Sequence, residues 1–188
     1  MRIISGSFKG KKILEPKDIK TRPLKDLTKE SIFNIIIHSE KLKINLENSV
    51  ILDLFSGVGS FGIECLSRNV KKVIFVENYN GVLPILKKNL ENLNLNEKFS
   101  ILEYDIYQDH VFSKLESKFD IIFLDPPYKV KNLDKLLIEI NNQKILDENG
   151  IVIIHRHKNE QEIIPKVFQI AEQKKYGISK ITFLTKLN

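Results

Sequence analysis

The chain has 188 residues, of which 42% are hydrophobic and 29% charged, a balance typical of one well-filled globular domain. It has no apolar stretch near the roughly 20 residues that a membrane helix needs, and its first residues lack the apolar core of a signal peptide. The single cysteine, Cys65, excludes an internal disulfide, and with four scattered histidines it forms no cluster of metal ligands. We therefore expect a cytoplasmic protein without a metal or a membrane partner, and nothing in the sequence requires more than a monomer.

The net charge of +6 is concentrated in one segment. Residues 1–29 hold nine Lys and Arg against three Asp and Glu, whereas residues 30–188 hold 21 of each. An excess gathered in one segment indicates a polyanionic partner such as nucleic acid more strongly than a uniform excess does. A solvated basic tail would have the same composition.

Residues 1–49 are predicted to form a basic extension that precedes the main domain. The extension contains, in order, a small β-hairpin over 2–14 that turns at Lys9-Gly10, a turn at Thr21-Arg22-Pro23, and a helix with Asp26 as N-cap and a broad apolar face from Leu27 to Ile37. A largely polar connection then leads to the second unit, residues 50–188.

From residue 50 onward, short apolar runs alternate with segments of helical periodicity. The predicted strands are 50–54, 72–76, 99–103, 120–124 and 151–155. The predicted helices are 60–68, 81–93, 109–116 and 133–142. This alternation predicts βαβ units, a parallel sheet and helices on both of its faces. Two further runs, 166–170 and 180–185, predict a final pair of strands with a hairpin turn near Tyr176-Gly177, so the fold class is a doubly wound α/β domain.

A glycine-rich segment, Asp53-Leu-Phe-Ser-Gly57-Val-Gly59-Ser-Phe-Gly62, follows the first of these strands. The glycines permit a tight turn and a close approach of a ligand, and the helix that follows leaves N–H donors free at its start. The spacing, with Glu77 twenty residues after Gly57, also matches the dinucleotide fingerprint of a dehydrogenase. However, Asp53 would repel a pyrophosphate, whereas it could accept hydrogen bonds from a cationic aminoacyl group.

Acidic residues stand at three successive strand ends. Asp53 ends the first strand, Glu77 follows the second, where it could bind ribose hydroxyls, and Asp105 follows the third, where it could face an adenine amine. A cofactor with a ribose, an adenine and an ammonium group fits all three acids, which indicates S-adenosylmethionine. The residues expected to bind it are Asp53, Phe55, Gly57, Gly59, Glu77, Asp105 and Ile106.

Asp125-Pro126-Pro127-Tyr128 follows a buried strand. Two consecutive prolines lack N–H donors and restrict φ, so the chain must leave the sheet abruptly. The turn then presents a carboxylate, a carbonyl oxygen and an aromatic ring at the strand end where open α/β sheets bind ligands. Two acceptors and a flat ring suit a planar substrate that carries an NH2 group, so we predict that all four residues are catalytic.

These motifs resemble the class I S-adenosylmethionine-dependent methyltransferases that modify amino groups. Three N-terminal motifs narrow the resemblance to the RsmD family: Arg2-Ile-Ile-Ser-Gly with Lys9-Gly10, Thr21-Arg22-Pro23, and Lys29-Glu-Ser-Ile-Phe-Asn34. The resemblance implies a Rossmann-like fold with a mostly parallel seven-stranded sheet. It also implies methylation of the N2 amine of a guanine in small-subunit ribosomal RNA, with either the RNA or the assembling small subunit as the substrate. The residues expected to hold RNA phosphates are Lys9, Lys11, Lys12, Lys20, Arg22 and Lys25.

The chain departs from the family pattern at three places. Leu27 stands where the family usually has arginine or another polar residue, Lys29 replaces a common arginine, and His155-Arg156-His157 stands where an acid is frequent. We expect His155 and His157 to be solvated at a strand end and assign neither a role.

Other functions remain open at this point. An adenine-N6 or other amine methyltransferase would use the same Asp-Pro-Pro-Tyr segment, and the substrate alone would distinguish it. A non-catalytic RNA-binding assembly factor could keep the scaffold, although the glycines and acids of the cofactor set are all present. A dehydrogenase has the least support, because nothing downstream of the glycines resembles a hydride-transfer site.

Overall fold

The structure, a computed structural model, describes residues 1–16, 24–108, 111–115, 117–127, 130 and 132–187. Three of the predicted site residues, Lys20, Arg22 and Tyr128, therefore lie outside the described residues. Within the described ranges, no helix combines the length and apolar character needed to cross a membrane.

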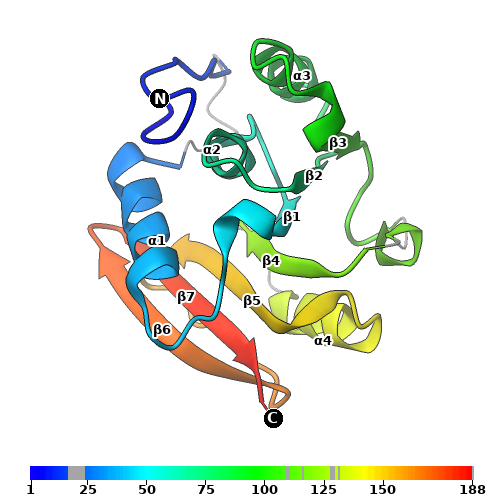
Figure 1. The fold of residues 1–188 in the computed structure, drawn as a ribbon. Coiled ribbons are helices and arrows are strands. Elements are labelled where there is room, and N and C mark those ends of the chain that lie inside the picture. Colours follow the sequence, from blue (N-terminus) through cyan, green and yellow to red (C-terminus); the bar gives the residue numbers. More distant parts are fainter. Residues whose placement is uncertain (17–23, 109–110, 116, 128–129, 131, 188) are drawn as a thin grey trace.

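A mixed sheet of strand order β3-β2-β1-β4-β5-β7-β6 forms the centre of the fold (Figure 1). Its strands are β1 (Val50–Leu54), β2 (Lys72–Val76), β3 (Phe99–Leu102), β4 (Phe119–Leu124), β5 (Leu146–His157), β6 (Phe168–Tyr176) and β7 (Ser179–Lys186). The first five strands pair in parallel, and β7 pairs antiparallel with both β5 and β6. The carboxyl ends of the parallel strands therefore share one edge of the sheet, which is where the described residues predicted for cofactor binding and catalysis lie.

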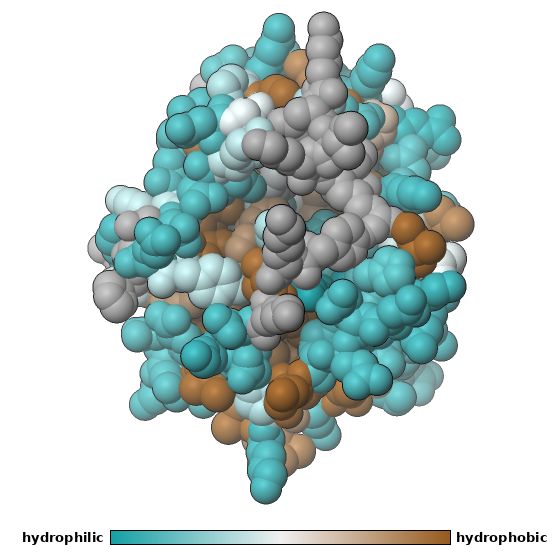
Figure 2. All heavy atoms as spheres, turned by 180° about the vertical axis from the view of Figure 1, so that it is seen from behind, coloured by the Kyte–Doolittle hydropathy of each residue, from teal (hydrophilic) through white to brown (hydrophobic). Residues whose placement is uncertain are grey.

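Helices cover both faces of the sheet, as the alternating pattern predicts. The described helices are α1 (Asp26–His38), α2 (Ser60–Ser67), α3 (Leu83–Glu91) and α4 (Leu133–Asn142), with 3-10 turns η1 (Leu46–Asn48), η2 (Asn96–Lys98) and η3 (Val111–Lys114). Because successive strand residues point to opposite faces, Ile51 packs with α1, α2 and α3, whereas Leu52 packs with α4 and η3. Figure 2 shows that the outer surface seen from behind is mainly hydrophilic, with smaller hydrophobic areas between.

Several elements differ from the sequence prediction. Asp26 is the first residue of α1 rather than its N-cap, and it lies beside Arg2, with 3.5 Å between Oδ2 and the Arg2 Nε. The apolar face of α1 is narrower than predicted, because Leu27 is 67% exposed and Ile37 is 50% exposed. The predicted helix over 109–116 is described only as the 3-10 turn η3. β5 starts five residues earlier than predicted and ends two residues later.

The N-terminal segment, residues 1–16, lies against α2 and α3 (Figure 1). The predicted hairpin is present as a turn closed by one antiparallel bridge, between Arg2 and Lys12, and without regular strands. Backbone bonds cross the turn from the amides of Ile3, Gly10 and Ile13. The amides of Ile4 and Ser5 donate to the Glu64 carboxylate of α2 at 2.8 and 3.0 Å, so the ladder does not continue through these two residues.

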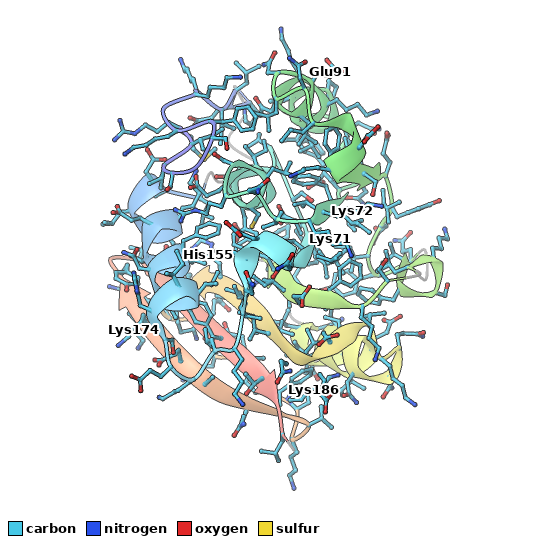
Figure 3. All side chains as sticks on the ribbon, viewed as in Figure 1. Lys71, Lys72, Glu91, His155, Lys174 and Lys186 are labelled. Atoms are coloured by element: carbon cyan, nitrogen blue, oxygen red, sulfur yellow. The ribbon has the colours of Figure 1, made fainter. Side chains whose placement is uncertain are left out.

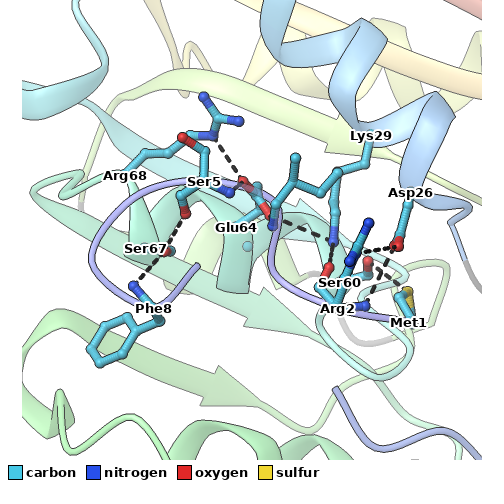
Figure 4. A network of polar contacts seen from close by, with 12 residues as sticks. Met1, Arg2, Ser5, Phe8, Asp26, Lys29, Ser60, Glu64, Ser67 and Arg68 are labelled. Carbon is cyan, nitrogen blue, oxygen red and sulfur yellow. Dashed lines mark hydrogen bonds and ion pairs between the residues drawn. The ribbon is translucent and has the colours of Figure 1, made fainter. Parts of the chain in front are cut away.

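A buried ion network attaches the N-terminal segment to α1 and α2 (Figure 4). Glu64 pairs with Lys29 of α1 at 3.5 Å and with Arg68 at 3.0 Å, and Lys29 also donates to the Arg2 carbonyl at 2.7 Å. Lys29 is fully buried, so burial lowers its pKa, and the charge of Glu64 opposes that shift. Lys29 is therefore a structural residue, and the segment is packed on the domain rather than free as a solvated tail.

Candidate active site

The described site residues gather at the carboxyl edge of the sheet. The last residue of β1 is paired with the last residue of β2 on one side and of β4 on the other. Phe55, Glu77 and Asp125 follow these three residues directly, with Phe55 in the middle. Asp105 and Ile106 come shortly after β3, on the other side of β2. The parallel topology thus brings together residues that are separated by about 20 residues or more in the sequence.

The three glycines of the loop have different roles. Gly57 has φ +57°, and a Cβ added there would meet nothing within 4 Å, so the loop faces open space at this residue. Gly59 has φ +84° and precedes α2 in a left-handed conformation that favours glycine. A Cβ on Gly62 would overlap the ring of Phe75, so Gly62 allows α2 to approach β2 closely. Gly57 is therefore the glycine of the three that has open space beside it, and its contact with a ligand stays a prediction.

Asp53 is almost fully buried and binds the start of α2. Its Oδ2 accepts the Gly62 amide at 3.0 Å. Burial raises the pKa of Asp53 well above its ordinary value, the Gly62 bond opposes the rise, and the charges of Asp125 and Glu77 add to it. In this conformation Asp53 holds the glycine loop on the helix; its contact with an aminoacyl group stays a prediction.

Glu77 binds the other side of the same loop. Its Oε2 accepts the Gly57 amide at 2.8 Å, and its Oε1 accepts the amides of Asn78 and Tyr79 at 3.0 and 2.8 Å. A carboxylate has about four acceptor positions, so Glu77 keeps capacity for a hydroxyl group next to Gly57. This placement fits the predicted contact with a ribose.

Phe55 and Ile106 form an apolar wall beside these acids. Phe55 has φ +59°, a conformation that is strained for a residue with a side chain and that is concentrated at functional sites. Its ring centroid lies 6.1 Å from that of Tyr107, and Ile106 is buried in the same cluster. Asp105 accepts the Tyr107 amide at 2.9 Å. An apolar wall with a carboxylate beside it suits a flat base that carries an amine.

Asp125 is held by a histidine that we did not predict to have a role. Its Oδ1 lies 2.9 Å from Nδ1 of His155, whose Nε2 lies 2.9 Å from Oγ of Ser179. His155 is buried, so the expectation that it is solvated is wrong. The reason is that β5 continues past His155 and pairs there with β7, whose Ser179 contacts the ring. His157, two residues further, is half-buried.

Arg156 binds the backbone of the proline turn. Its Nη1 donates to the carbonyls of Pro127 at 3.2 Å and Pro126 at 3.5 Å, and its Nη2 donates to the Val130 carbonyl at 3.0 Å. Two prolines contribute acceptors without donors, and a planar guanidinium with several N–H groups can satisfy a cluster of such carbonyls. The bond to Pro126 is the longest, which leaves that oxygen available for a further donor.

Residues 1–185 match the model of a family described as Conserved hypothetical protein 95. The chain belongs to this family. YlbH of Bacillus subtilis is 35% identical over 189 residues, which cover 99% of both proteins. The Haemophilus influenzae protein named Ribosomal RNA small subunit methyltransferase D is 30% identical over 179 residues, 95% of this chain and 90% of its own length. The resemblance to the RsmD family is confirmed.

Solved structures of proteins named as methylases or methyltransferases have a similar fold. A crystal structure from Haemophilus influenzae is 28% identical, with a TM-score of 0.77 over 100% of this chain and 98% of that one. The magnesium protoporphyrin IX methyltransferase of Synechocystis, solved with bound S-adenosylmethionine, is 17% identical with a TM-score of 0.62 and covers 86% of this chain and 79% of its own. The fold is therefore Rossmann-like with a mostly parallel sheet, as predicted for a class I methyltransferase.

The predicted phosphate-binding lysines are surface residues where the structure describes them. Lys9, Lys11, Lys12 and Lys25 are all exposed. Lys11 also packs over the Phe8 ring at 4.9 Å. Among the residues that the structure describes, no group of three or more His, Cys, Asp and Glu is arranged to hold a metal ion.

Proposed function

We propose that this protein transfers a methyl group from S-adenosylmethionine to the exocyclic N2 amine of a guanine in small-subunit ribosomal RNA. The observation that carries the proposal is the position of the Asp125 carboxylate and the Pro126 carbonyl, beside the glycine loop and its acids. Family membership supports ribosomal RNA as the substrate, since a relative of nearly equal length is named Ribosomal RNA small subunit methyltransferase D.

The residues at the carboxyl edge fit S-adenosylmethionine in chemistry. Glu77 would accept hydrogen bonds from the ribose, Phe55 and Ile106 would pack on the adenine, and Asp105 would accept from its amine. The open side of Gly57 leaves room for the ligand. Burial is the main cause of the raised pKa of Asp53, and the nearby carboxylates of Asp125 and Glu77 add to it. A cationic ligand would be favoured beside these carboxylates.

Asp125 and Pro126 would act on the acceptor amine. The lone pair of a guanine amine is delocalised into the ring, so hydrogen bonds from both N–H groups to these two oxygens would favour a tetrahedral nitrogen with a free lone pair. When bound, S-adenosylmethionine supplies the methyl group, and the C–S bonding pair stays on sulfur as the N–C bond forms. Asp125 would take the proton that the nitrogen then loses. Alignment of amine and methyl group would supply much of the acceleration.

The N-terminal extension would bind the RNA. We propose that residues 1–49 form the RNA-binding part and 50–188 the catalytic part, with the exposed lysines of the N-terminal segment on RNA phosphates. The two parts share one hydrophobic core, so the extension would present RNA at a constant position relative to the glycine loop. The target base must be unpaired or flipped to reach Asp125, and Tyr128 is predicted to stack on it.

The proposal is tested by methyl transfer from radiolabelled S-adenosylmethionine to small-subunit particles that lack the modification. We expect label in N2-methylguanosine with the wild-type protein and a loss of at least about a hundredfold with Asp125→Ala. Glu91→Ala, which removes an exposed carboxylate at the end of α3, is the matched control and should retain full activity (Figure 3). Label in N6-methyladenosine, or in protein, would overturn the guanine assignment.

A further inference from the structure

The imidazole of His155 is bound at both of its nitrogens. Nδ1 faces Oδ1 of Asp125 and Nε2 faces Oγ of Ser179, each at 2.9 Å. The His155 side chain is 10% exposed, whereas that of Asp125 is 26% exposed. Figure 3 shows His155 inside the molecule rather than at its surface. The ring therefore lies between the end of β4 and the start of β7, with little freedom to rotate.

The donors and acceptors of Asp125, His155 and Ser179 determine where the protons lie in their hydrogen bonds. A carboxylate oxygen and an unprotonated ring nitrogen would repel each other at 2.9 Å, so a proton must lie between Asp125 and His155. A neutral imidazole with its proton on Nδ1 donates to Asp125 and accepts the Ser179 hydroxyl proton at Nε2. Both contacts are then satisfied while the ring stays neutral.

We propose that His155 is a positioning residue for methyl transfer: its Nδ1–H holds Oδ1 of Asp125 and leaves Oδ2 to accept the substrate amine. The inference rests on the function proposed above. The oxygen that His155 does not hold can accept an N–H of the amine and then its proton. Because one oxygen is held, the other has a constant direction, and orientation of this kind is a major part of such catalysis.

The proton released by the amine has a simple route. It passes from nitrogen to Oδ2 of Asp125 and from there to water, since Asp125 is partly exposed. His155 and Ser179 keep their own protons, so no further acceptor is needed. Arg156 does not duplicate this role, because its guanidinium binds backbone carbonyls of the proline turn and not the Asp125 carboxylate.

Three substitutions of His155 separate the two contacts of the ring. The amide nitrogen of asparagine is as many bonds from Cβ as Nδ1 is, so His155→Asn keeps a donor toward Asp125. The amide nitrogen of glutamine matches Nε2, so His155→Gln keeps a contact with Ser179 and loses the donor to Asp125. His155→Ala removes both. His38→Gln, at the exposed end of α1, is the control for an unrelated histidine.

Steady-state methyl transfer to small-subunit particles measures the effect. We expect kcat to fall roughly 10- to 100-fold in His155→Gln and His155→Ala, with KM for the particles and affinity for S-adenosylmethionine near wild type. His155→Asn should stay within about threefold of wild type, and His38→Gln should be unchanged. Equal kcat values in the Asn and Gln variants would overturn the positioning role, because a structural role does not depend on which nitrogen remains.

A spectroscopic measurement tests the contact without an acceptor. The chain has four histidines, so the ¹⁵N resonances of the imidazoles can be assigned by comparison with His155→Asn. Asp125→Ala should shift the Nδ1 resonance of His155, and an unchanged resonance would overturn the contact between His155 and Asp125.

The failure of this inference can be distinguished from the failure of the proposed function. Wild-type activity on another nucleoside would contradict only the guanine substrate, since the same variants can be compared on that nucleoside. A wild-type protein that methylates no acceptor would defeat both proposals.

Discussion

Replacement of Glu64 by alanine should destabilise the protein by about 3–5 kcal/mol, the range for removal of one partner from a buried ion pair. The Glu64 carboxylate is fully buried and accepts four donors, the amides of Ile4 and Ser5 and the side chains of Lys29 and Arg68. Without it, Lys29 keeps only the Arg2 carbonyl as a described partner and must be buried either unpaired or deprotonated. Its lowered pKa shows that burial already disfavours the charged form.

Thermal and urea unfolding would measure this loss. For a chain of this length, 3–5 kcal/mol corresponds to a fall in Tm of roughly 6–20 °C. Glu30→Ala, which removes an exposed carboxylate next to Lys29, should change stability by less than about 0.5 kcal/mol. The double variant Lys29→Met with Glu64→Ala should lose less than the sum of the single losses, because it leaves no unpaired lysine. A Glu64→Ala protein within 1 kcal/mol of wild type, roughly the noise of such measurements, would refute the reasoning.

Two further predictions follow from the described contacts. Asp53→Asn keeps an acceptor for the Gly62 amide but removes a buried acid. Because the pKa of Asp53 is raised in the folded state, that state binds more protons than the unfolded state above about pH 4, and the stability of the wild type falls as pH rises there. The stability of the variant relative to wild type should therefore increase from pH 4 to pH 8 in urea titrations, and a constant difference would contradict the buried carboxylate. Replacement of the exposed Lys9, Lys11 and Lys12 by glutamine should weaken RNA binding and leave cofactor affinity unchanged. The slope of log affinity against log salt concentration should fall in magnitude by roughly 2, and an unchanged slope would show that this segment is not part of the RNA interface.

Much of the fold follows from local pattern in the sequence. The bounds of β1 and β2 agree with the prediction, because a short apolar run between turn residues has few alternatives to a buried strand. The glycine loop and the Asp-Pro-Pro turn were also predictable, since glycine and proline restrict the backbone by their own covalent structure. The family was recognisable for the same reason: its motifs are contiguous in the chain.

The supports of the site depend on contacts between distant segments, which no local pattern encodes. Asp125 and His155 are 30 residues apart, and Ser179 is a further 24, so only the pairing of β4, β5 and β7 brings them into one chain of hydrogen bonds. Lys29 and Glu64 are likewise on different helices. Sequence alone determined which chemical groups stand at the strand ends. Tertiary structure decided which are buried and paired, because the cost of burying a polar group is set by its neighbours in space.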